Sequence, residues 1–379
     1  MRIALLTRSY PDEGDLYKYP FVHRRVLAYM AAGHAVMVIR LGSECAVHVF
    51  EGAECHTVPL DRLVQTVAAF APDVIAFHGP DETSWPAARM LGERWPVCLW
   101  LHGSEIPDFF RAKARAIAEE GARGAALDAV ERRALFWRET LADWPSWLWM
   151  TFVSHSAAAM MAGDLDPCPM PGDRIAAIPN PIDTDLFAYR PKVEADRYRI
   201  LSLRPYDSPT YGNDLAVKAV QALAQRPDFG QMQFTFIGDG PMFDDVLCPL
   251  MNLANVHIER RFLKQAEIAA VHAGHGMFLV PTRLDTHGVS RDEAMASGLV
   301  PVTNAVAAVP EYADASCAGL AGADDHGGLA REIAAMIDDP ALFLARSAAA
   351  AARVRRQSGH AAVIPREIAW LEHCRDAAR

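Results

Sequence analysis

Short runs of apolar and β-branched residues alternate along the chain with longer stretches in which apolar residues recur at helical spacing. In the first half, the runs that predict strands are 3–7, 35–41, 74–78, 97–101 and 150–154. The runs at 74–78 and 97–101 are almost wholly apolar, as strands buried on both faces must be. Helical patterns are found at 21–32, 60–70 and 84–94 and over much of 111–141. This alternation is typical of an open parallel sheet covered by helices.

The second half of the chain repeats the same alternation. Strands are expected at 200–203, 234–237, 256–258, 277–280 and 300–303, and helices at 214–225, 265–273, 289–297 and 328–337. Between the halves, the segment 179–196 is rich in Pro and Asp, which is typical of a linker. We therefore expect an α/β protein with two domains, 1–184 and 185–358, and a C-terminal helix within 359–379 that packs back on the first domain.

Length, charge and cysteine content narrow the function classes. The 379 residues are too many for one ordinary core and suit two domains. A net charge of −10 argues against nucleic acid as a partner, because phosphate binding needs a concentrated basic face. Seven scattered cysteines without a C-x-x-C fit a reducing compartment. With no signal-peptide pattern and no apolar run of about 20 residues, we expect a cytoplasmic protein.

The segment 109–149 combines charges of both signs with four tryptophans at its end, Trp137, Trp144, Trp147 and Trp149. One interpretation is a helix that binds the acceptor or contacts the inner face of a membrane. The other is an amphipathic helix whose tryptophans pack in the core, and the balanced charge favours this second interpretation.

Candidate chemistry is concentrated in the segment 281–304. A buried strand ends at Pro281, a loop carries Asp285 and Gly288, and a helix beginning near Val289 carries Glu293. Open α/β sheets bind ligands at the carboxyl ends of their strands. The N–H groups at the start of this helix can receive a phosphate, and a carboxylate such as Glu293 can accept bonds from two adjacent hydroxyls of a ribose.

Weaker candidates follow other strands. Gly238 and Gly240 form a strand-to-helix turn that permits close approach of a nucleotide, and Arg204 at a strand end is a candidate phosphate ligand. His102 ends a buried strand of the first half, where it could bond a sugar hydroxyl. Two D-x-D patterns, at 164–166 and 183–185, and a His272-x-x-His275 could suggest a metal, but nothing else supports a site there, so no metal is expected.

Together these motifs resemble the retaining glycosyltransferases of family 4, of the bacterial glycan-biosynthesis type. Their signature, E-x7-E followed by A-M-A-x-G-x-P-V, corresponds here to Asp285, Glu293 and the stretch AMASGLVPV at 294–302, which has one more residue between its glycine and its proline. The resemblance extends to the GDGP turn at 238–241, the IPNPID segment at 178–183, HG at 102–103, GH at 33–34 and PE at 310–311. It implies the GT-B fold, in which two Rossmann-like, doubly wound parallel-sheet domains face a central cleft.

The resemblance also implies an activity and a set of site residues. A sugar would move with retention from a nucleotide-diphosphate sugar, with UDP- and GDP-sugars as the first candidates, to a hydroxyl of a glycan, glycolipid or other acceptor, without cofactor or metal. The implied catalytic residues are His102 near the anomeric carbon, Asp285 on the transferred sugar and Glu293 on the ribose. The implied donor-binding residues are Arg204, Gly238, Gly240, Arg261, Phe262, Leu263, Thr286, His287, Gly288, Val289, Ser290 and Glu293.

Three departures from the family pattern change these expectations. The first acidic residue of the signature is Asp285 rather than Glu, and Tyr211 stands where a phosphate-binding lysine is usual. A diphosphate then needs another cation, for which Arg283 and Arg291 are candidates, while Tyr211 could add a phenolic hydrogen bond. The usual glycine pair of the first loop is absent, with Ser9, Tyr10, Pro11 and Gly14 in its place. A sugar-nucleotide epimerase of the same fold and a binding subunit without catalysis remain as alternatives.

Overall fold

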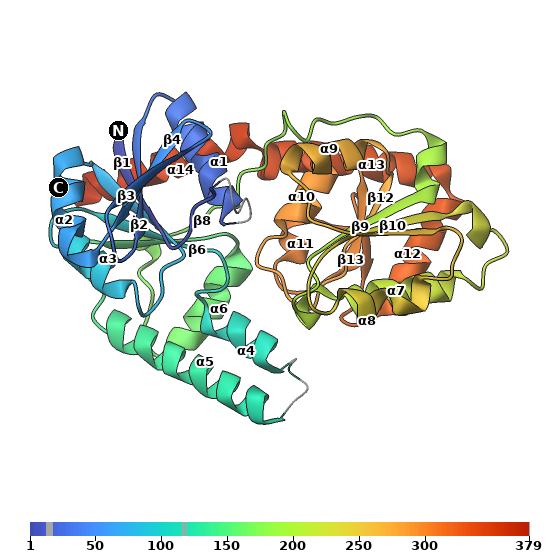
Figure 1. Ribbon diagram of the computed structural model, residues 1–379, viewed down its shortest axis with the longest axis horizontal. Helices are drawn as coiled ribbons and strands as arrows, with labels where there is room; N and C mark the ends of the chain where they lie inside the picture. Colours follow the sequence, from blue (N-terminus) through green and yellow to red (C-terminus); the bar gives the residue numbers. More distant parts are fainter. Residues whose placement is uncertain (13–17, 116, 118–119, 379) are drawn as a thin grey trace. The chain divides into compact units, whose positions relative to one another are not determined.

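A computed structural model describes residues 1–12, 18–115, 117 and 120–378, so Gly14 of the first loop lies outside the described residues. The chain divides into two compact units. The N-terminal unit comprises Met1–Pro181 and His360–Arg379, and the C-terminal unit comprises Ile182–Gly359 (Figure 1). Among the described residues, none of the helices has the length and apolar character needed to cross a membrane.

The N-terminal unit is built on an eight-stranded sheet of order β3-β4-β2-β1-β5-β6-β7-β8. All neighbouring strands are parallel except β3 and β4, which form an antiparallel hairpin at one edge. The strands are β1 (Arg2–Thr7), β2 (Ala35–Leu41), β3 (Ala46–Phe50), β4 (Ala53–Val58), β5 (Val74–His78), β6 (Val97–Leu101), β7 (Leu148–Phe152) and β8 (Ile175–Ala177). The helices are α1 (Pro20–Ala31), α2 (Leu60–Phe70), α3 (Trp85–Gly92), α4 (Pro107–Arg115), α5 (Glu120–Leu141), α6 (His155–Leu165) and α14 (His360–Ala377).

The C-terminal unit is built on a six-stranded parallel sheet of order β11-β10-β9-β12-β13-β14. Its strands are β9 (Arg199–Leu203), β10 (Gln233–Gly238), β11 (Val256–Arg260), β12 (Met277–Leu279), β13 (Val300–Asn304) and β14 (Gly319–Ala321). Its helices are α7 (Asn213–Leu223), α8 (Phe243–Leu247), α9 (Gln265–Ala273), α10 (Val289–Ala296), α11 (Val309–Tyr312), α12 (His326–Asp338) and α13 (Pro340–Gln357).

Alternating apolar side chains bury both faces of each sheet. Ile200 of β9 packs in the cluster formed with α7 and α12, whereas its neighbour Leu201 packs in the cluster formed with α9 and α10. In the N-terminal unit, Leu6 of β1 faces the helices α2, α3, α5 and α6, and Leu5 faces α1 and α14. Both units are therefore three-layered, as the nearly continuous apolar strands predict.

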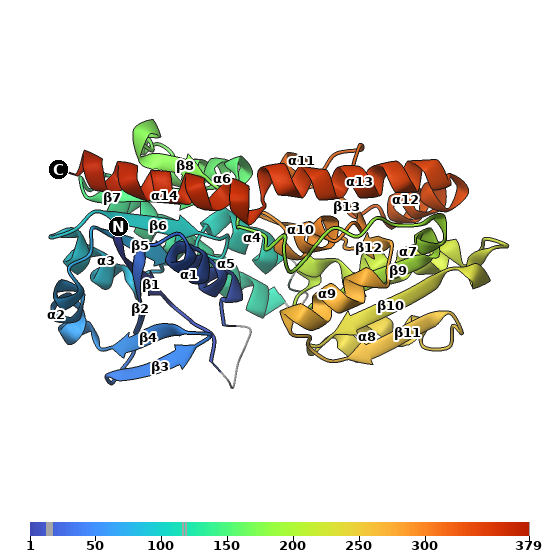
Figure 2. The ribbon, with the colours of Figure 1, turned by 90° about the horizontal axis from the view of Figure 1, so that it is seen from above.

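The C-terminal helix α14 is held on the N-terminal unit by a fully buried charge network. Arg25 of α1 and Glu367 of α14 are both 0% exposed, and their Nε and Oε1 atoms are 2.8 Å apart. Tyr29 donates to Glu367 Oε2 at 2.6 Å, and Arg25 Nη2 donates to Asn180 Oδ1 at 2.9 Å. Figure 2 shows α14 running along the sheet of this unit. Asn180, expected in a linker, is thus part of the packed structure.

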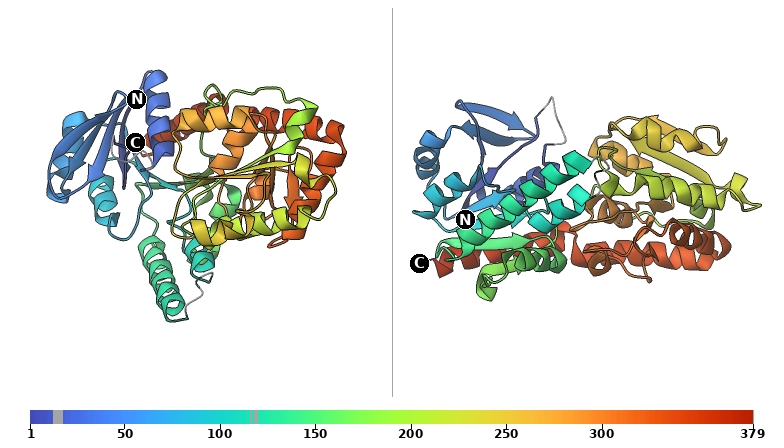
Figure 3. Two further views of the ribbon diagram at one scale, coloured as in Figure 1. Left: turned by 45° about the vertical axis from the view of Figure 1, so that its right-hand side comes forward. Right: turned by 90° about the horizontal axis from the view of Figure 1, so that it is seen from below.

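Helices α4 and α5 replace the single helical stretch expected over 111–141 and lie side by side (Figure 3). Trp137 and Trp149 are buried, and Trp144 and Trp147 are half-buried against the core. Their positions favour the core-packing interpretation of this segment.

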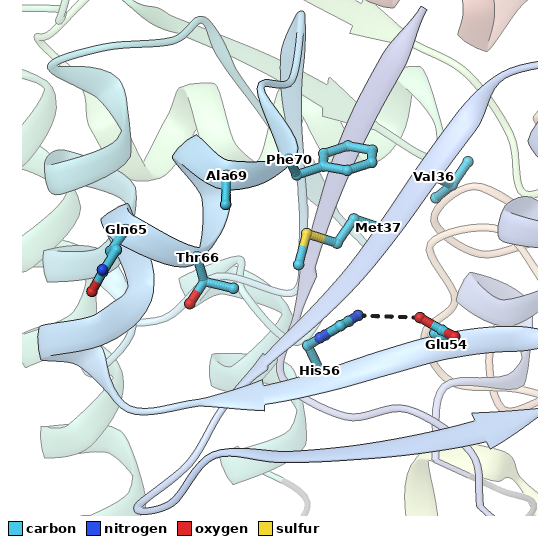
Figure 4. A pocket seen from close by; sticks show the side chains of 8 residues that line it. All are labelled: Val36, Met37, Glu54, His56, Gln65, Thr66, Ala69 and Phe70. Carbon is cyan, nitrogen blue, oxygen red and sulfur yellow. Dashed lines mark ion pairs between the residues drawn. The ribbon is translucent and has the colours of Figure 1, made fainter.

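A hollow of about 560 Å³ lies between α2 and the strands β2 and β4 (Figure 4). Its lining includes Val36 and Met37 at the start of β2, Glu54 near the start of β4 and Phe70 at the end of α2. It therefore opens at the amino ends of the strands, away from the carboxyl ends at which the candidate residues of this unit lie.

Candidate active site

In each sheet, the direction in which the chain adds successive strands reverses at one point. In the C-terminal unit, β9 lies between β10 and β12, so the chain winds outward in both directions from the gap between β9 and β12. In the N-terminal unit, the corresponding pair is β1 and β5. Loops that leave the carboxyl ends of such a pair turn to opposite faces of the sheet, and the crevice between them is where open α/β sheets bind ligands.

The two loops at the C-terminal reversal point are tied together. Arg283 N donates to Thr210 O at 2.9 Å, and Thr282 Oγ1 donates to the same oxygen at 3.3 Å. Gly212, which has φ +63°, packs so closely on Pro281 that an added Cβ would lie 3.2 Å from the carbonyl carbon of Pro281. The loop carrying Tyr211 and the loop carrying Asp285 therefore form one surface.

Arg204 follows β9 and is buried at 6% exposure. Its Nη1 lies 3.3 Å from Ser290 Oγ at the start of α10, and its Nη2 lies 3.4 Å from the Pro281 carbonyl oxygen. Within the described part of the chain, Nε has no hydrogen-bond partner and the guanidinium makes no ion pair with a carboxylate. Burial lowers the pKa of Arg204, and the charge of Asp285 opposes that change. A buried positive charge without an anionic partner is costly, so this position is suited to an anionic ligand.

Gly288 is the N-cap of helix α10, and its φ of +88° lets the chain turn into the helix. Its first-turn N–H groups, including those of Val289 and Ser290, have no intrahelical acceptors, and Ser290 also meets Arg204. The start of α10 therefore combines backbone donors and a guanidinium within one small region, as an anion site requires.

Arg291 is buried beneath this helix start rather than projecting from it. Its Nη2 donates to Asp292 Oδ1 at 2.7 Å and also to the His287 carbonyl oxygen. An added Cβ on Gly288 would lie 2.8 Å from Arg291 Nη1. Asp292 in turn accepts from Ser358 Oγ at 2.8 Å and lies 3.2 Å from His287 Nε2. Arg291 therefore supports the 287–288 backbone, and a carboxylate already offsets its charge.

The two carboxylates of the signature occupy different surroundings. Asp285 lies on the loop, and its Oδ1 accepts a bond from the His287 N–H at 3.0 Å. Glu293 lies on α10 at 8% exposure, with its Oε1 3.5 Å from Gln265 Nε2 at the start of α9. Thr286 and His287 between them are buried. The structure thus brings Arg204, Asp285, Gly288, Ser290 and Glu293 together around one helix start.

The other two candidate phosphate ligands have partners of their own. Arg283 forms ion pairs with Asp214, at 2.8 Å, and with Asp324, at 2.7 Å. The Tyr211 ring lies under the guanidinium of Arg204, with 4.8 Å between the guanidinium carbon and the ring centroid. Tyr211 therefore packs against a buried cation and adds no positive charge of its own.

The glycine turn after β10 has a local explanation. A Cβ on Gly238 would lie 2.0 Å from the Arg204 carbonyl oxygen, and one on Gly240 would lie 2.5 Å from the Tyr206 carbonyl carbon. Both glycines therefore let the 204–207 backbone approach β10, whether or not a nucleotide also lies there.

The segment 261–263 presents three different side chains. Arg261 is paired with Glu259 and Glu267, Phe262 is 51% exposed, and Leu263 is buried in the core cluster with α9 and α10. Of these three side chains, Phe262 therefore offers an exposed aromatic ring.

The acidic and histidine patterns that could suggest a metal are engaged in ordinary contacts. Asp164 accepts from the Asp108 N–H and from Arg111, and Asp183 accepts from two N–H groups of its own turn. His272 bonds Ser297, and His275 bonds Thr235. Across the described residues, no group of three or more His, Cys, Asp or Glu side chains is arranged to hold a metal ion.

In the N-terminal unit, His102 follows β6 and is held from two sides. Its Nε2 lies 3.0 Å from Nδ1 of His78 at the end of β5. Its backbone N–H and that of Gly103 both donate to Glu105 Oε2, at 2.7 and 2.9 Å. Burial raises the pKa of Glu105, while these N–H donors favour its charged form. His78 and Glu105 were not expected as site residues from the sequence, although His78 ends a predicted strand.

Residues 198–339 match the family model "Glycosyl transferases group 1". This segment lies within the C-terminal unit and contains every candidate donor-binding residue of that unit. No curated protein sequence matches the chain.

Several solved structures share the architecture of the whole chain. A sucrose-phosphate synthase from Thermosynechococcus elongatus aligns over 100% of both chains, with a TM-score of 0.75 and 15% identity. HepE from Anabaena, solved with UDP and glucose, aligns over 98% of this chain and 99% of its own, with a TM-score of 0.71 and 15% identity. A trehalose-phosphate synthase from Burkholderia vietnamiensis aligns over 98% of both chains, with a TM-score of 0.69 and 15% identity. The chain has the GT-B fold, which confirms the predicted fold class.

Proposed function

We propose that this chain is a retaining glycosyltransferase that moves a sugar from a nucleotide-diphosphate sugar to a hydroxyl of a glycan, glycolipid or other acceptor. The observation that carries the proposal is Arg204, a buried guanidinium without a carboxylate partner among the described residues, at the start of α10. A diphosphate is the ligand that this guanidinium and the adjacent N–H groups would neutralise together.

The comparisons support the same donor class. The family model covers the unit that contains Arg204, Asp285 and Glu293. HepE was solved with UDP and glucose, and the trehalose-phosphate synthase from Burkholderia vietnamiensis is UDP-forming. We therefore infer UDP-sugars as the first donors to test, followed by GDP-sugars.

The proposed chemistry assigns separate tasks to the residues of the C-terminal unit. Glu293 would accept bonds from the ribose hydroxyls, and Asp285 would accept bonds from hydroxyls of the transferred sugar. As the bond from the anomeric carbon to the diphosphate breaks, the acceptor oxygen would form the new bond on the same face of the sugar and pass its proton to an oxygen of the leaving diphosphate. Arg204 and the first-turn N–H groups of α10 would stabilise the charge that develops on the leaving diphosphate.

The proposal is tested first by thermal shift with UDP, GDP, ADP and CMP, and then by NMR of the sugar released from the stabilising donor. Stabilisation by one nucleotide, followed by sugar release or transfer with the anomeric configuration kept, is the expected result. Binding without any turnover would instead favour a binding-only relative, and conversion of the donor sugar without transfer would favour an epimerase.

Substitutions at Asp285 should separate the effect of its charge on turnover from the effect of its side-chain length. Asp285→Asn keeps the size but removes the charge that the sugar hydroxyls would meet, so turnover should fall about tenfold or more. Asp285→Glu should retain turnover or change the preferred donor sugar. Initial rates with a panel of sugars on the preferred nucleotide measure both effects. Equal rates for the Asn variant and the wild type would remove Asp285 from the donor-sugar site.

We expect transfer to need no divalent metal, because the proposed site offers a guanidinium and backbone N–H groups to the diphosphate. Turnover should therefore be unchanged in excess EDTA. A loss of turnover in EDTA that Mn²⁺ restores would contradict this expectation and direct attention to Asp164 or Asp183.

A further inference from the structure

The carboxylate of Asp292 lies inside the C-terminal unit next to the start of α10, and both of its oxygens are engaged. Asp292 is 1% exposed, and its Oδ1 accepts bonds from Arg291 Nε at 3.0 Å and from Arg291 Nη2 at 2.7 Å. Its Oδ2 accepts from Ser358 Oγ at 2.8 Å and lies 3.2 Å from His287 Nε2. Although burial disfavours its charge, Arg291 and these neighbours hold the pKa of Asp292 below its usual value. Asp292 is therefore a carboxylate that pairs with a buried guanidinium.

This ion pair holds the guanidinium of Arg291 against the backbone of the loop before α10. Arg291 Nη2 also donates to the His287 carbonyl oxygen. The guanidinium carbon lies 5.5 Å from the centroid of the Tyr312 ring, and a Cβ added to Gly288 would lie 2.8 Å from Arg291 Nη1. Arg291 therefore contacts the peptide between His287 and Gly288 directly and is enclosed on several sides.

The bond to the His287 carbonyl also determines where the next N–H points. The peptide between His287 and Gly288 is trans, and the C=O and N–H groups of a planar trans peptide point in opposite directions. The Gly288 N–H is therefore directed away from the Arg291 Nη2 that holds the carbonyl. Because Gly288 is the N-cap of α10, the helix itself does not use this N–H. Asp285 fixes the preceding peptide, since its Oδ1 accepts the His287 N–H at 3.0 Å.

Packing alone does not explain why this space is filled by an ion pair. Apolar side chains of similar volume often give equal or greater stability than a buried ion pair. The next two residues of α10, Ala294 and Met295, are apolar and fully buried, so the helix accommodates such side chains. What the pair of Arg291 and Asp292 adds is a fixed direction for one peptide. A cation at the carbonyl also strengthens the N–H of the same peptide as a donor.

We propose that Asp292, acting through Arg291, is a positioning residue that directs the Gly288 N–H toward the diphosphate of the donor. The peptide is set before the ligand arrives, so no reorientation is needed when charge develops on the leaving group. This role rests on the proposed function, which assigns the diphosphate to the start of α10. Arg204 reaches the same helix start through Ser290, so a guanidinium and an oriented N–H act on the same group.

The variant Asp292→Asn separates this role from a simple effect of charge, because the two predict opposite changes in affinity. Without the carboxylate, the charge of Arg291 is no longer offset, so a site that needed only positive charge would bind UDP more tightly. Loss of the fixed peptide instead predicts an affinity for UDP that is about 10- to 100-fold lower. The affinity for uridine, which has no phosphate, should be unchanged. Isothermal titration measures both, with GDP and guanosine in their place if the thermal-shift screen selects GDP.

A control and a second variant make this test specific. Glu332→Gln removes a carboxylate that pairs with Arg346 in the same unit and should bind UDP as the wild type does. Arg291→Met combined with Asp292→Leu replaces both ions by apolar side chains, so the protein should unfold at or above the wild-type temperature. Its affinity for UDP should nevertheless fall, and its affinity for uridine should stay.

UDP binding by folded Asp292→Asn that equals or exceeds that of the wild type would overturn the proposal. If Asp292→Asn does not fold, wild-type UDP binding by the double variant would overturn it in the same way.

Binding and turnover together separate this role from the proposed function. If Asp292→Asn loses affinity for UDP as expected while the wild type transfers no sugar, the positioning role stands and the transferase proposal fails. If sugar is transferred but Asp292→Asn binds UDP normally, the transferase proposal stands and the positioning role fails. A wild type that binds no nucleoside diphosphate would contradict both.

Discussion

Replacing Glu293 with alanine is expected to lower the affinity for the nucleotide-sugar donor about 30- to 1000-fold while the protein stays folded. The carboxylate lies at 8% exposure on α10, one turn beyond the helix start that meets Arg204. A charged group that accepts two ribose hydroxyls contributes about 2 to 4 kcal/mol of binding, which corresponds to this loss. Isothermal titration with UDP and with the preferred UDP-sugar measures the change.

Two comparison variants make the Glu293 result specific. Glu293→Gln keeps one carbonyl acceptor and should bind with intermediate affinity. Glu194→Ala removes an exposed glutamate of the same unit and should bind as the wild type does. If a folded Glu293→Ala protein keeps full affinity for the donor, the ribose role must be assigned elsewhere.

The sequence predicts the fold well because its central strands are buried on both faces. The apolar runs at 74–78 and 97–101 correspond to β5 and β6, and helix α2 has the predicted bounds 60–70. The sequence analysis did not predict the hairpin β3–β4. In the structure, Glu51 and Gly52 between its strands both have positive φ, as a tight hairpin turn requires. The edge strand β3 is apolar at four of its five positions, so its sequence did carry a strand signal, although most of those side chains are exposed.

The charge environment of the site could not be predicted in the same way. Arg283 and Arg291 were expected to compensate for the missing lysine because they flank the signature. Whether either is free depends on Asp214 and Asp324, which are distant in sequence, and on the direction in which Asp292 points within α10. Such partners become visible only when the loops are brought together in three dimensions.

His78 illustrates a site residue that the sequence analysis missed. Its strand and the strand of His102 were both expected, and neighbouring parallel strands end at the same edge of a sheet. Two histidines at consecutive strand ends should therefore lie close together, as they do. Strand order, which periodicity alone does not give, was the missing step.

Arg204→Ala is expected to lower the turnover number about 100- to 1000-fold, because removing one preorganised donor to a developing negative charge has an effect of this size. Within the described residues, Arg204 is the candidate cation that lacks a carboxylate partner. Arg204→Lys should recover part of the rate. An ammonium keeps the charge, but it cannot replace a guanidinium that donates from several nitrogens in a fixed plane. Single-turnover rates measure the chemical step directly.

The other arginines provide the contrast for this result. Arg283→Ala should keep near-normal turnover, because its charge is offset by Asp214 and Asp324. Arg291 is the better candidate for a second cation, since its Nη1 lies against Gly288 and has no hydrogen-bond partner in the described part of the chain. Arg291→Lys, which keeps a charge for Asp292, should lower turnover less than Arg204→Ala does.

If Arg291→Lys and Arg283→Ala both turn over normally while Arg204→Ala does not, a single guanidinium and the α10 N–H groups suffice for the diphosphate. If Arg204→Ala is also normal, the buried charge has another purpose and the transferase proposal loses its main support.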